Sequence, residues 1–313
     1  HSPAAQREVR RSPVIVSKKW MGRGVALLTG GSAIATFLMV LLIIGIIVHG
    51  GAGHLSWDFI FGSPEQGMTE GGIFPAIVGT FLLVVLMSIA GVPIGTITAI
   101  YLNEYVGQTS KIGRSIRFAV NTLAGIPAIV FGLFGLGFFI SFMGGGMDKV
   151  FNGGTLMWGQ PNILWASLTL ALLTLPVVIV SVEEAIKSVP RELREGSLAL
   201  GATKLETIWK IVLPQSMTGI LTGAILAVSR GAGEVAPILF TGAAYFLPDM
   251  PNQLTDQFME LGYHIYIMST QSPDVEATKP IQFATTLVLL ILTFTLNFSA
   301  IFLRWHMRRR AIR

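Results

Sequence analysis

The 313-residue sequence contains no cysteine. A disulfide, a thiol nucleophile and a cysteine-ligated metal are therefore excluded. A G-x4-G-K-[S/T] phosphate-binding loop and an H-E-x-x-H zinc motif are also missing. We expect no ATP hydrolysis, no catalytic residues and no metal site in this chain. The internal histidines are scattered over expected loops and helix ends, so we predict that each is solvated or interfacial: His49, His54, His264 and His306.

Charge is scarce as well, because charged residues make up 12% of the chain against 52% hydrophobic residues. A soluble fold of this size would lack polar cover for its surface. A membrane-spanning helix needs about 20 apolar residues. Six runs meet that requirement, and they predict an all-α polytopic membrane protein: Val25–Val48, Ile73–Leu102, Phe118–Met143, Ile163–Val182, Met217–Phe246 and Ile281–Leu303.

The basic residues indicate which way the predicted spans run. Nineteen of the 22 Lys and Arg residues fall in the two termini and in the second and fourth loops, and the exceptions are Arg230, Lys149 and Lys279. The positive-inside rule makes that side cytoplasmic, with both termini on it. The net charge of +5 thus reports topology, and it does not indicate nucleic-acid binding. The opposite loops carry acidic residues instead: Asp58, Glu65, Glu70, Asp148, Asp249, Asp256, Glu260, Asp274 and Glu276.

These features predict four regions and no tandem repeat. The regions are a cytoplasmic tail (1–23), a first transmembrane helix with a periplasmic loop (24–72), the main transmembrane domain (73–304) and a basic cytoplasmic tail (305–313). Within the loop 247–280, an apolar centre predicts a short interfacial helix. Prolines inside predicted spans favour kinked helices around a shared cavity; they are Pro93, Pro127, Pro176 and Pro237.

The loop 190–214 lies between the fourth and fifth predicted spans. Pro190 suits the first turn of a helix, and Gly201 should end that helix at an elbow with no room for a side chain. Thr203 and Glu206 form a capping-box pattern that starts a second helix. Two short helices joined at a glycine would form a knob that enters a cleft on a soluble partner. The alternative is an amphipathic helix resting on lipid headgroups.

Two charges interrupt the fifth predicted span. Arg230 and Glu234 are four residues apart, so they would share a helix face and pair. In a helix that starts at Met217, Arg230 lies about 20 Å along the axis, past the bilayer midpoint. A charge there costs at least ~2.5 kcal/mol. The pair is either a neutralised structural pair or an anion site in a translocation path, and paired guanidinium donors suit phosphate.

The loop 190–214 resembles the EAA loop of bacterial ABC importers, whose pattern is E-A-A-x3-G-x9-I-x-L-P. The chain supplies Glu195, Gly201 and the terminal Ile211-x-Leu213-Pro214 at the same spacing. It departs where Gly196 and Ser197 replace the two alanines.

Further motifs are similar to those of the PstA family, permease subunits of bacterial phosphate importers, over about 61–304. They are Glu70–Ala76, Ile100–Tyr105, Leu200–Thr203 and Ser229-Arg230-x-x-Gly233-Glu234-x-Ala236-Pro237. The family often has Ala-Ile and Thr where this chain has Gly231-Ala232 and Val235. The sister PstC family carries similar motifs.

The resemblance implies a six-span type I permease with a MetI-like core in the bacterial inner membrane. It implies a PstC-like permease partner, two PstB-like ATPase subunits and a PstS-like phosphate-binding protein. The chain itself would bind no cofactor, and the ATPase would use ATP and Mg. The resemblance also assigns residues to ATPase coupling (Glu195, Gly196, Leu200, Gly201, Ala202, Thr203 and Glu206) and to the substrate pathway (Arg230 and Glu234).

Three alternatives remain at this point. The chain could be the sister permease PstC, or a type I permease for another oxyanion such as sulfate or molybdate. An ion-coupled secondary transporter would also carry intramembrane charges, but it usually has inverted repeats and more spans. Such a transporter would not need a loop for docking a partner.

Overall fold

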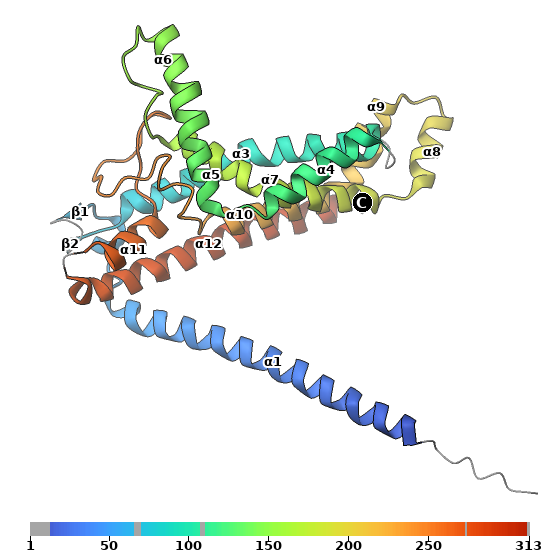
Figure 1. Cartoon of the computed structure of the whole chain (residues 1–313), viewed down its shortest axis with the longest axis horizontal. Coiled ribbons are helices and arrows are strands. Elements are labelled where there is room, and N and C mark those ends of the chain that lie inside the picture. The colour runs from blue at the N-terminus through green and yellow to red at the C-terminus, as the bar shows by residue number, and fades with distance from the viewer. Residues whose placement is uncertain (1–12, 66–69, 107–109, 273, 312–313) are drawn as a thin grey trace, which may run out of the picture. The chain divides into compact units, whose positions relative to one another are not determined.

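The computed structural model describes residues 13–65, 70–106, 110–272 and 274–311 (Figure 1). The helices are α1 (Pro13–Gly51), η1 (Ala52–His54), α2 (Trp57–Phe61), α3 (Phe74–Ile100), η3 (Tyr101–Tyr105), α4 (Lys111–Ala124), α5 (Ala128–Phe134), η4 (Gly135–Gly144), α6 (Gly145–Phe151), α7 (Ile163–Lys187), α8 (Arg191–Ala199), α9 (Lys204–Thr207), η5 (Ile208–Val212), α10 (Leu213–Gly231), α11 (Leu261–Thr270) and α12 (Val275–Ala311). η1 is a 3-10 helix, and η3, η4 and η5 are π-helices. The strands β1 (Pro64–Glu65) and β2 (Glu70–Gly71) form an antiparallel pair.

Six helical segments in the described ranges are long and apolar enough to cross a membrane, which confirms the all-α polytopic fold. They are Gly22–His54, Phe74–Tyr105, Ala128–Phe151, Ile163–Lys187, Lys204–Gly231 and Val275–His306. Residues 1–50 form a unit separate from 51–313. α1 begins inside the predicted tail 1–23, and residues 1–12 lie outside the described ranges. Large apolar side chains of α1 are exposed between Val25 and Val48.

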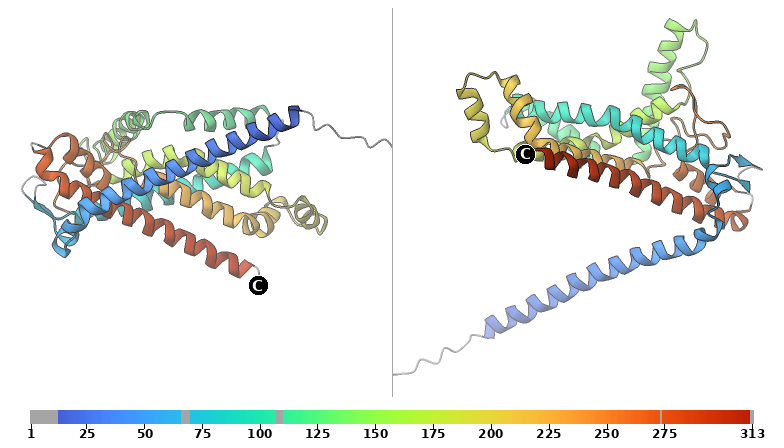
Figure 2. Two further views of the ribbon diagram at one scale, coloured as in Figure 1. Left: turned by 90° about the horizontal axis from the view of Figure 1, so that it is seen from below. Right: turned by 180° about the vertical axis from the view of Figure 1, so that it is seen from behind.

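In the unit 51–313, α7 is the central helix, with α3 and α10 packed against it and α12 against α10 (Figure 2). Gly91 and Gly95 of α3 face α7, and a Cβ at Gly91 would lie 3.5 Å from Ala171. Gly219 and Gly223 of α10 approach Ala185 and Ser181 of α7 in the same way. Each pair has the G-x-x-x-G spacing that lets helix backbones approach closely in lipid. These two contacts fix α3 and α10 on α7.

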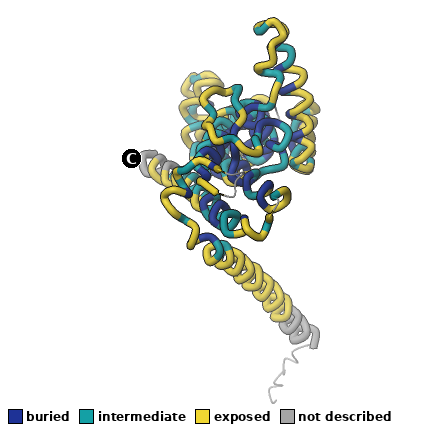
Figure 3. The backbone as a smooth tube through the Cα atoms, turned by 90° about the vertical axis from the view of Figure 1, so that its left-hand side faces the viewer, coloured by how far each residue is buried: buried dark blue, intermediate teal, exposed yellow. Residues whose placement is uncertain are grey.

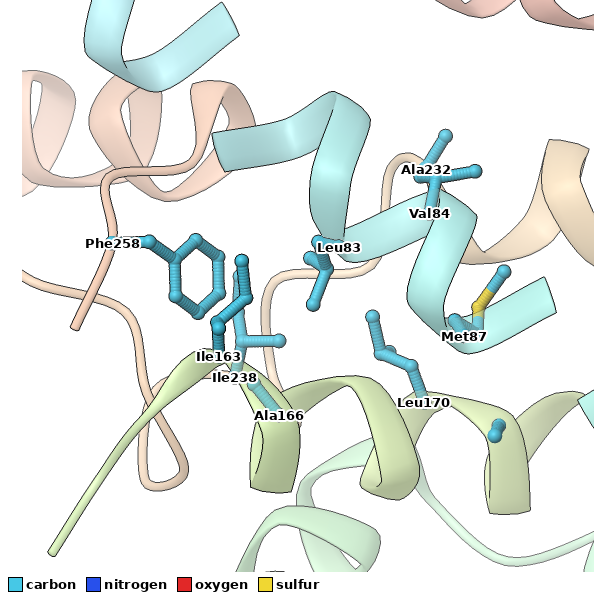
Figure 4. Packing of buried hydrophobic residues seen from close by; sticks show 10 residues of the cluster. Leu83, Val84, Met87, Ile163, Ala166, Leu170, Ala232, Ile238 and Phe258 are labelled. Atoms are coloured by element: carbon cyan, nitrogen blue, oxygen red, sulfur yellow. The ribbon is translucent and has the colours of Figure 1, made fainter. Parts of the chain in front are cut away.

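A buried cluster continues this packing toward the end of the bundle that carries α11. Leu83 of α3, Leu170 of α7 and Phe258 from the loop before α11 converge there (Figure 4). Ala232 and Ile238, which follow α10, pack into the same cluster. The cluster therefore holds the chain just beyond Arg230 against α3 and α7.

The third and fifth predicted spans were placed wrongly. Gly125–Pro127 separates α4 from α5, so the run 118–143 is not one helix, and the candidate span is 128–151. The fifth helix runs from Lys204 to Gly231, not from Met217 to Phe246. Pro127 and Pro237 consequently lie outside helices. Hydropathy averages miss these breaks because the glycines and prolines lie among apolar neighbours. Pro93 and Pro176 lie inside α3 and α7, as predicted.

The α8–α9 loop and the α11 region lie at opposite ends of the bundle, in agreement with the predicted alternation of loops (Figures 1 and 2). α11 is the helix expected in the loop 247–280, and it packs into the protein rather than lying on its surface. Leu261, Ile267 and Met268 are almost fully buried against α3 and α12. Buried residues gather in the interior of the helix bundle (Figure 3). The prediction of a solvated His264 was also wrong, because that side chain is buried.

The two glycines of α3 provide a matched test of close helix packing. A Cβ at Gly95 would lie 2.6 Å from Cγ1 of the fully buried Val178, whereas one at Gly91 meets nothing nearer than 3.5 Å. We predict that Gly95→Ala destabilises the protein by about 1–3 kcal/mol, as overpacking does. Gly91→Ala should be tolerated. Thermal unfolding midpoints in detergent measure both effects, and equal midpoints for the two variants would contradict this packing.

Candidate functional site: the coupling loop and the Arg230–Glu234 pair

The first arm of the loop 190–214 is α8. Pro190 is its N-cap, one residue earlier than predicted, with an extended ψ of 140°. Gly201 follows the helix with φ +87°, which L side chains rarely adopt. A Cβ at Gly201 would meet nothing within 4 Å, so the expected crowding at the elbow was wrong. The glycine is required by the backbone conformation alone.

The second arm starts with the predicted capping box. Glu206 N donates to Thr203 Oγ1 at 3.2 Å, and Thr203 N donates to Glu206 Oε2 at 2.9 Å. α9 then runs through η5 into α10 without a break. The second arm is therefore the start of the fifth span, and it is not a separate short helix.

The two arms are linked, and their outer surface is open. The hydroxyls of Ser197 and Thr207 lie 3.0 Å apart across the loop. Glu195 and Gly196 are exposed, and Leu200 is 91% exposed at the elbow. The two arms form a knob that projects from the end of the bundle (Figure 1).

Arg194 behaves differently from its neighbours in α8, and sequence reasoning missed this. Its guanidinium turns inward and donates to the carbonyls of Ile186 and Val189, both at 2.7 Å. It also pairs with Glu104, at the end of η3, at 3.2 Å. Arg194 therefore anchors α8 to the bundle and does not face outward from the knob.

The structure brings Arg230 and Glu234 together, with Arg230 Nε 3.7 Å from Glu234 Oε1. They do not share a helix, because α10 ends at Gly231 and Glu234 lies in the turns that follow. Arg230 is 26 residues from Lys204, about 39 Å along the axis, and thus lies in the last turn rather than just past the middle. A cation there is also favoured by the helix dipole.

The residues on either side of Arg230 contact α3 and α12. A Cβ at Gly231 would overlap Met87 of α3, so the end of α10 lies directly against that helix. Ser229 donates to Asn297 of α12 at 2.6 Å. Among the side chains that the structure describes, none forms a hydrogen bond to the Nη atoms of Arg230, whose side chain is 41% exposed. The guanidinium fork is thus positioned and accessible.

A buried polar group lies outside the six candidate spans, at the start of α11. Glu260 caps this helix by accepting from the N–H groups of Gly262 and Tyr263 at 2.9 and 2.6 Å. Burial raises the pKa of Glu260 to about 7, although those hydrogen bonds and Thr80 act in the opposite direction. Burial also lowers the pKa of His264, one turn later, to about 4.

The fold and the knob define the membrane-spanning permease subunit of a type I ABC importer. Residues 91–313 match the family "Binding-protein-dependent transport system inner membrane component", and the chain belongs to this family. A bacterial alginate ABC transporter has the same fold, with a TM-score of 0.62 at 16% identity over 96% of this chain and 98% of that one. This chain is therefore a transport subunit and not the ATPase.

Its curated relatives place the chain among PstA-like permeases. It is 33% identical to a probable phosphate transport system permease protein PstA of Methanocaldococcus jannaschii, over 72% of this chain and 73% of that protein. PstA 1 of Mycobacterium tuberculosis is 39% identical over 56% of this chain and about half (52%) of its own length. A probable ABC transporter permease of Bacillus subtilis, YqgI, is 30% identical over 89% and 93%.

The opposite pKa shifts of Glu260 and His264 give a pH prediction. Between about pH 4.5 and 6.5 the folded protein holds a proton on Glu260, whereas the unfolded chain holds one on His264. The two contributions to stability therefore cancel. In Glu260→Gln only the histidine term remains, so stability should rise with pH, by up to ~1.4 kcal/mol per unit. In His264→Phe only the raised glutamic-acid pKa remains, so stability should fall as pH rises.

Unfolding midpoints of the purified protein across this pH range measure these slopes. Slopes of the same sign in both variants would contradict the assignment of the two protons.

Proposed function

We propose that this chain is a permease subunit of an ATP-driven phosphate importer and forms half of its translocation pathway. The observation that carries the proposal is the accessible Arg230 paired with Glu234 at the end of α10. The phosphate transport permeases among its relatives support the substrate. The proposed partners are a PstC-like permease, two PstB-like ATPases and a PstS-like phosphate-binding protein.

Arg230 is suited to an anion because its ion pair with Glu234 is made through Nε, at 3.7 Å. The two Nη groups can donate in parallel to two oxygens of one phosphate, which a lysine cannot do. Glu234 leaves the site near neutral when empty and can accept from a protonated phosphate oxygen. A purely structural pair would need neither the exposure of Arg230 nor the free fork.

The α8–α9 knob is proposed as the docking element for the ATPase. Its exposed surface carries Glu195, Gly196 and Leu200, and its elbow and second arm carry Gly201, Ala202, Thr203 and Glu206. The chain would bind no cofactor itself, and ATP and Mg would be used by the docked subunit. The basic residues around this end favour a cytoplasmic location for the knob and both termini in a bacterial inner membrane.

Two other assignments differ only in partner or substrate. The sister permease PstC would occupy the other half of the same complex. A permease for sulfate or molybdate would use the same guanidinium for a different oxyanion. Competition for uptake of labelled phosphate by sulfate and molybdate separates the substrates.

Arg230 is expected to be needed for uptake. Arg230→Gln should abolish phosphate uptake at normal complex yield, because an amide cannot supply the positive charge that offsets phosphate desolvation. Arg230→Lys should recover little, since it loses the fork. Uptake of labelled phosphate in proteoliposomes is the measurement. Near wild-type uptake by Arg230→Gln would remove this residue from the pathway.

Glu234→Gln distinguishes the two roles of the carboxylate. If Glu234 is a gate or accepts from phosphate, uptake falls at normal yield of the complex, which is the result we expect. If Glu234 is only a counter-ion, the yield of the complex falls together with uptake.

Gly201 and Gly196 form a matched pair for ATPase docking. Neither has an atom within 4 Å of an added Cβ, but only Gly201 has a positive φ. Gly201→Ala should cost roughly 1–2 kcal/mol of backbone strain and reduce copurification of the ATPase. Gly196→Ala restores the alanine of the EAA pattern inside α8 and should bind normally. Equal capture of the ATPase by both variants would show that the elbow conformation is not needed for docking.

A further inference from the structure

The π-helix η3, at the end of α3, contacts four other helices: α4, α7, α8 and α9. Arg117 of α4 donates from Nη2 to the carbonyl of Leu102 at 2.9 Å, and its Nε pairs with the buried Glu183 at 3.1 Å. The last carbonyls of a helix lack partners within it, so this bond satisfies one of them. The end of α3 is therefore fixed to α4 and α7 rather than frayed.

The next residues of η3 reach both arms of the coupling loop. Glu104 forms an ion pair with Arg194 of α8, and their side chains are only 12% and 19% exposed. Tyr105 lies under the ammonium group of Lys204 of α9, 5.0 Å from the ring centroid. The single turn η3 thus contacts α8, which precedes the Gly201 elbow, and α9, which follows it.

The Glu104–Arg194 contact differs from the other ion pair of this loop. Lys210 and Glu206 lie 3.4 Å apart with side chains 73% and 46% exposed, where water and salt screen the attraction. Arg194 is partly buried and is also bonded to the carbonyls of Ile186 and Val189. Loss of Glu104 would leave a poorly solvated cation at the base of α8 without its counter-charge.

We propose that Glu104 is a positioning residue which, through Arg194, holds the coupling loop (190–214) on the end of α3. A displacement of α8 would then move α8 and α3 together as one rigid unit. The proposal rests on the docking role given to the loop above. α3 packs along α7 through Gly91 and Gly95, so a movement of α3 reaches the central helix. Without Glu104, α8 would move with the ATPase while α3 lagged behind.

The first test measures the loop itself and needs no ATPase. Because the chain has no native cysteine, spin labels can be placed at Leu198→Cys in α8 and Ile97→Cys in α3, both exposed positions. Pulsed electron paramagnetic resonance on the full chain in nanodiscs should give a narrow distance distribution. Glu104→Gln should broaden it, and Glu104→Asp, which keeps the carboxylate, should largely restore it. Lys210→Gln, which breaks the exposed pair in the same loop, should leave the distribution narrow.

The second test measures coupling in the assembled transporter in proteoliposomes. With Glu104→Gln, the ATPase should still copurify, while ATP hydrolysed per phosphate imported should rise by about fivefold or more, the lower end of typical coupling between sites. Lys210→Gln should keep the parent ratio. A parent-like ratio and a narrow distribution in Glu104→Gln would overturn the proposal.

The two tests separate this proposal from the docking role on which it rests. If no ATPase copurified with the parent chain, the proposed docking role would fail, while the distance distributions would still report whether Glu104 positions α8. Loss of the ATPase from Glu104→Gln with an unchanged distribution would overturn the positioning role, because Glu104 would then act on docking directly.

Discussion

The arrangement of the bundle depends on how closely α3 and α10 approach α7. Lipid offers apolar side chains much the same environment as a protein interior, so burial of leucine and valine cannot by itself hold membrane helices together. The pairs Gly91–Gly95 and Gly219–Gly223 supply what burial does not, because they let backbone lie against α7. These contacts position both functional elements, since α3 carries η3 at one end of the bundle and α10 carries Arg230 at the other.

Much of this fold could be predicted from the sequence, because hydropathy and charge act over long windows. The six apolar segments and the capping box at Thr203 and Glu206 were confirmed. The boundaries of the third and fifth spans were wrong, because isolated breakers at Gly125–Pro127 and Gly231–Gly233 barely change a window average. α11 was found, but its burial was not, since that depends on contacts with α3 and α12.

The candidate site, too, could be predicted from the sequence only in part. Residue spacing predicted that Arg230 and Glu234 would pair, and they do, yet the end of α10 between them changed their depth and surroundings. The contact of Glu104 with Arg194 joins residues far apart in the chain, so no local pattern could reveal it. Gly201 was placed correctly for the wrong physical reason, because a sequence shows a glycine but not whether space or φ requires it.

The π-turn η5, between α9 and α10, has a consequence for how relatives of this chain can vary. A π-turn accommodates one more residue than an α-turn, and each residue advances an α-helix by about 100°. Because the π-turn holds its extra residue within a single turn, deleting one residue within Ile208–Val212 would convert this turn to regular α-helix and leave α9 on nearly the same face of α10. Deleting one residue from the regular part of α10 would instead rotate everything before it by about 100°. The π-turn therefore lets the chain lose one residue here without changing the direction in which the partner-facing surface is presented.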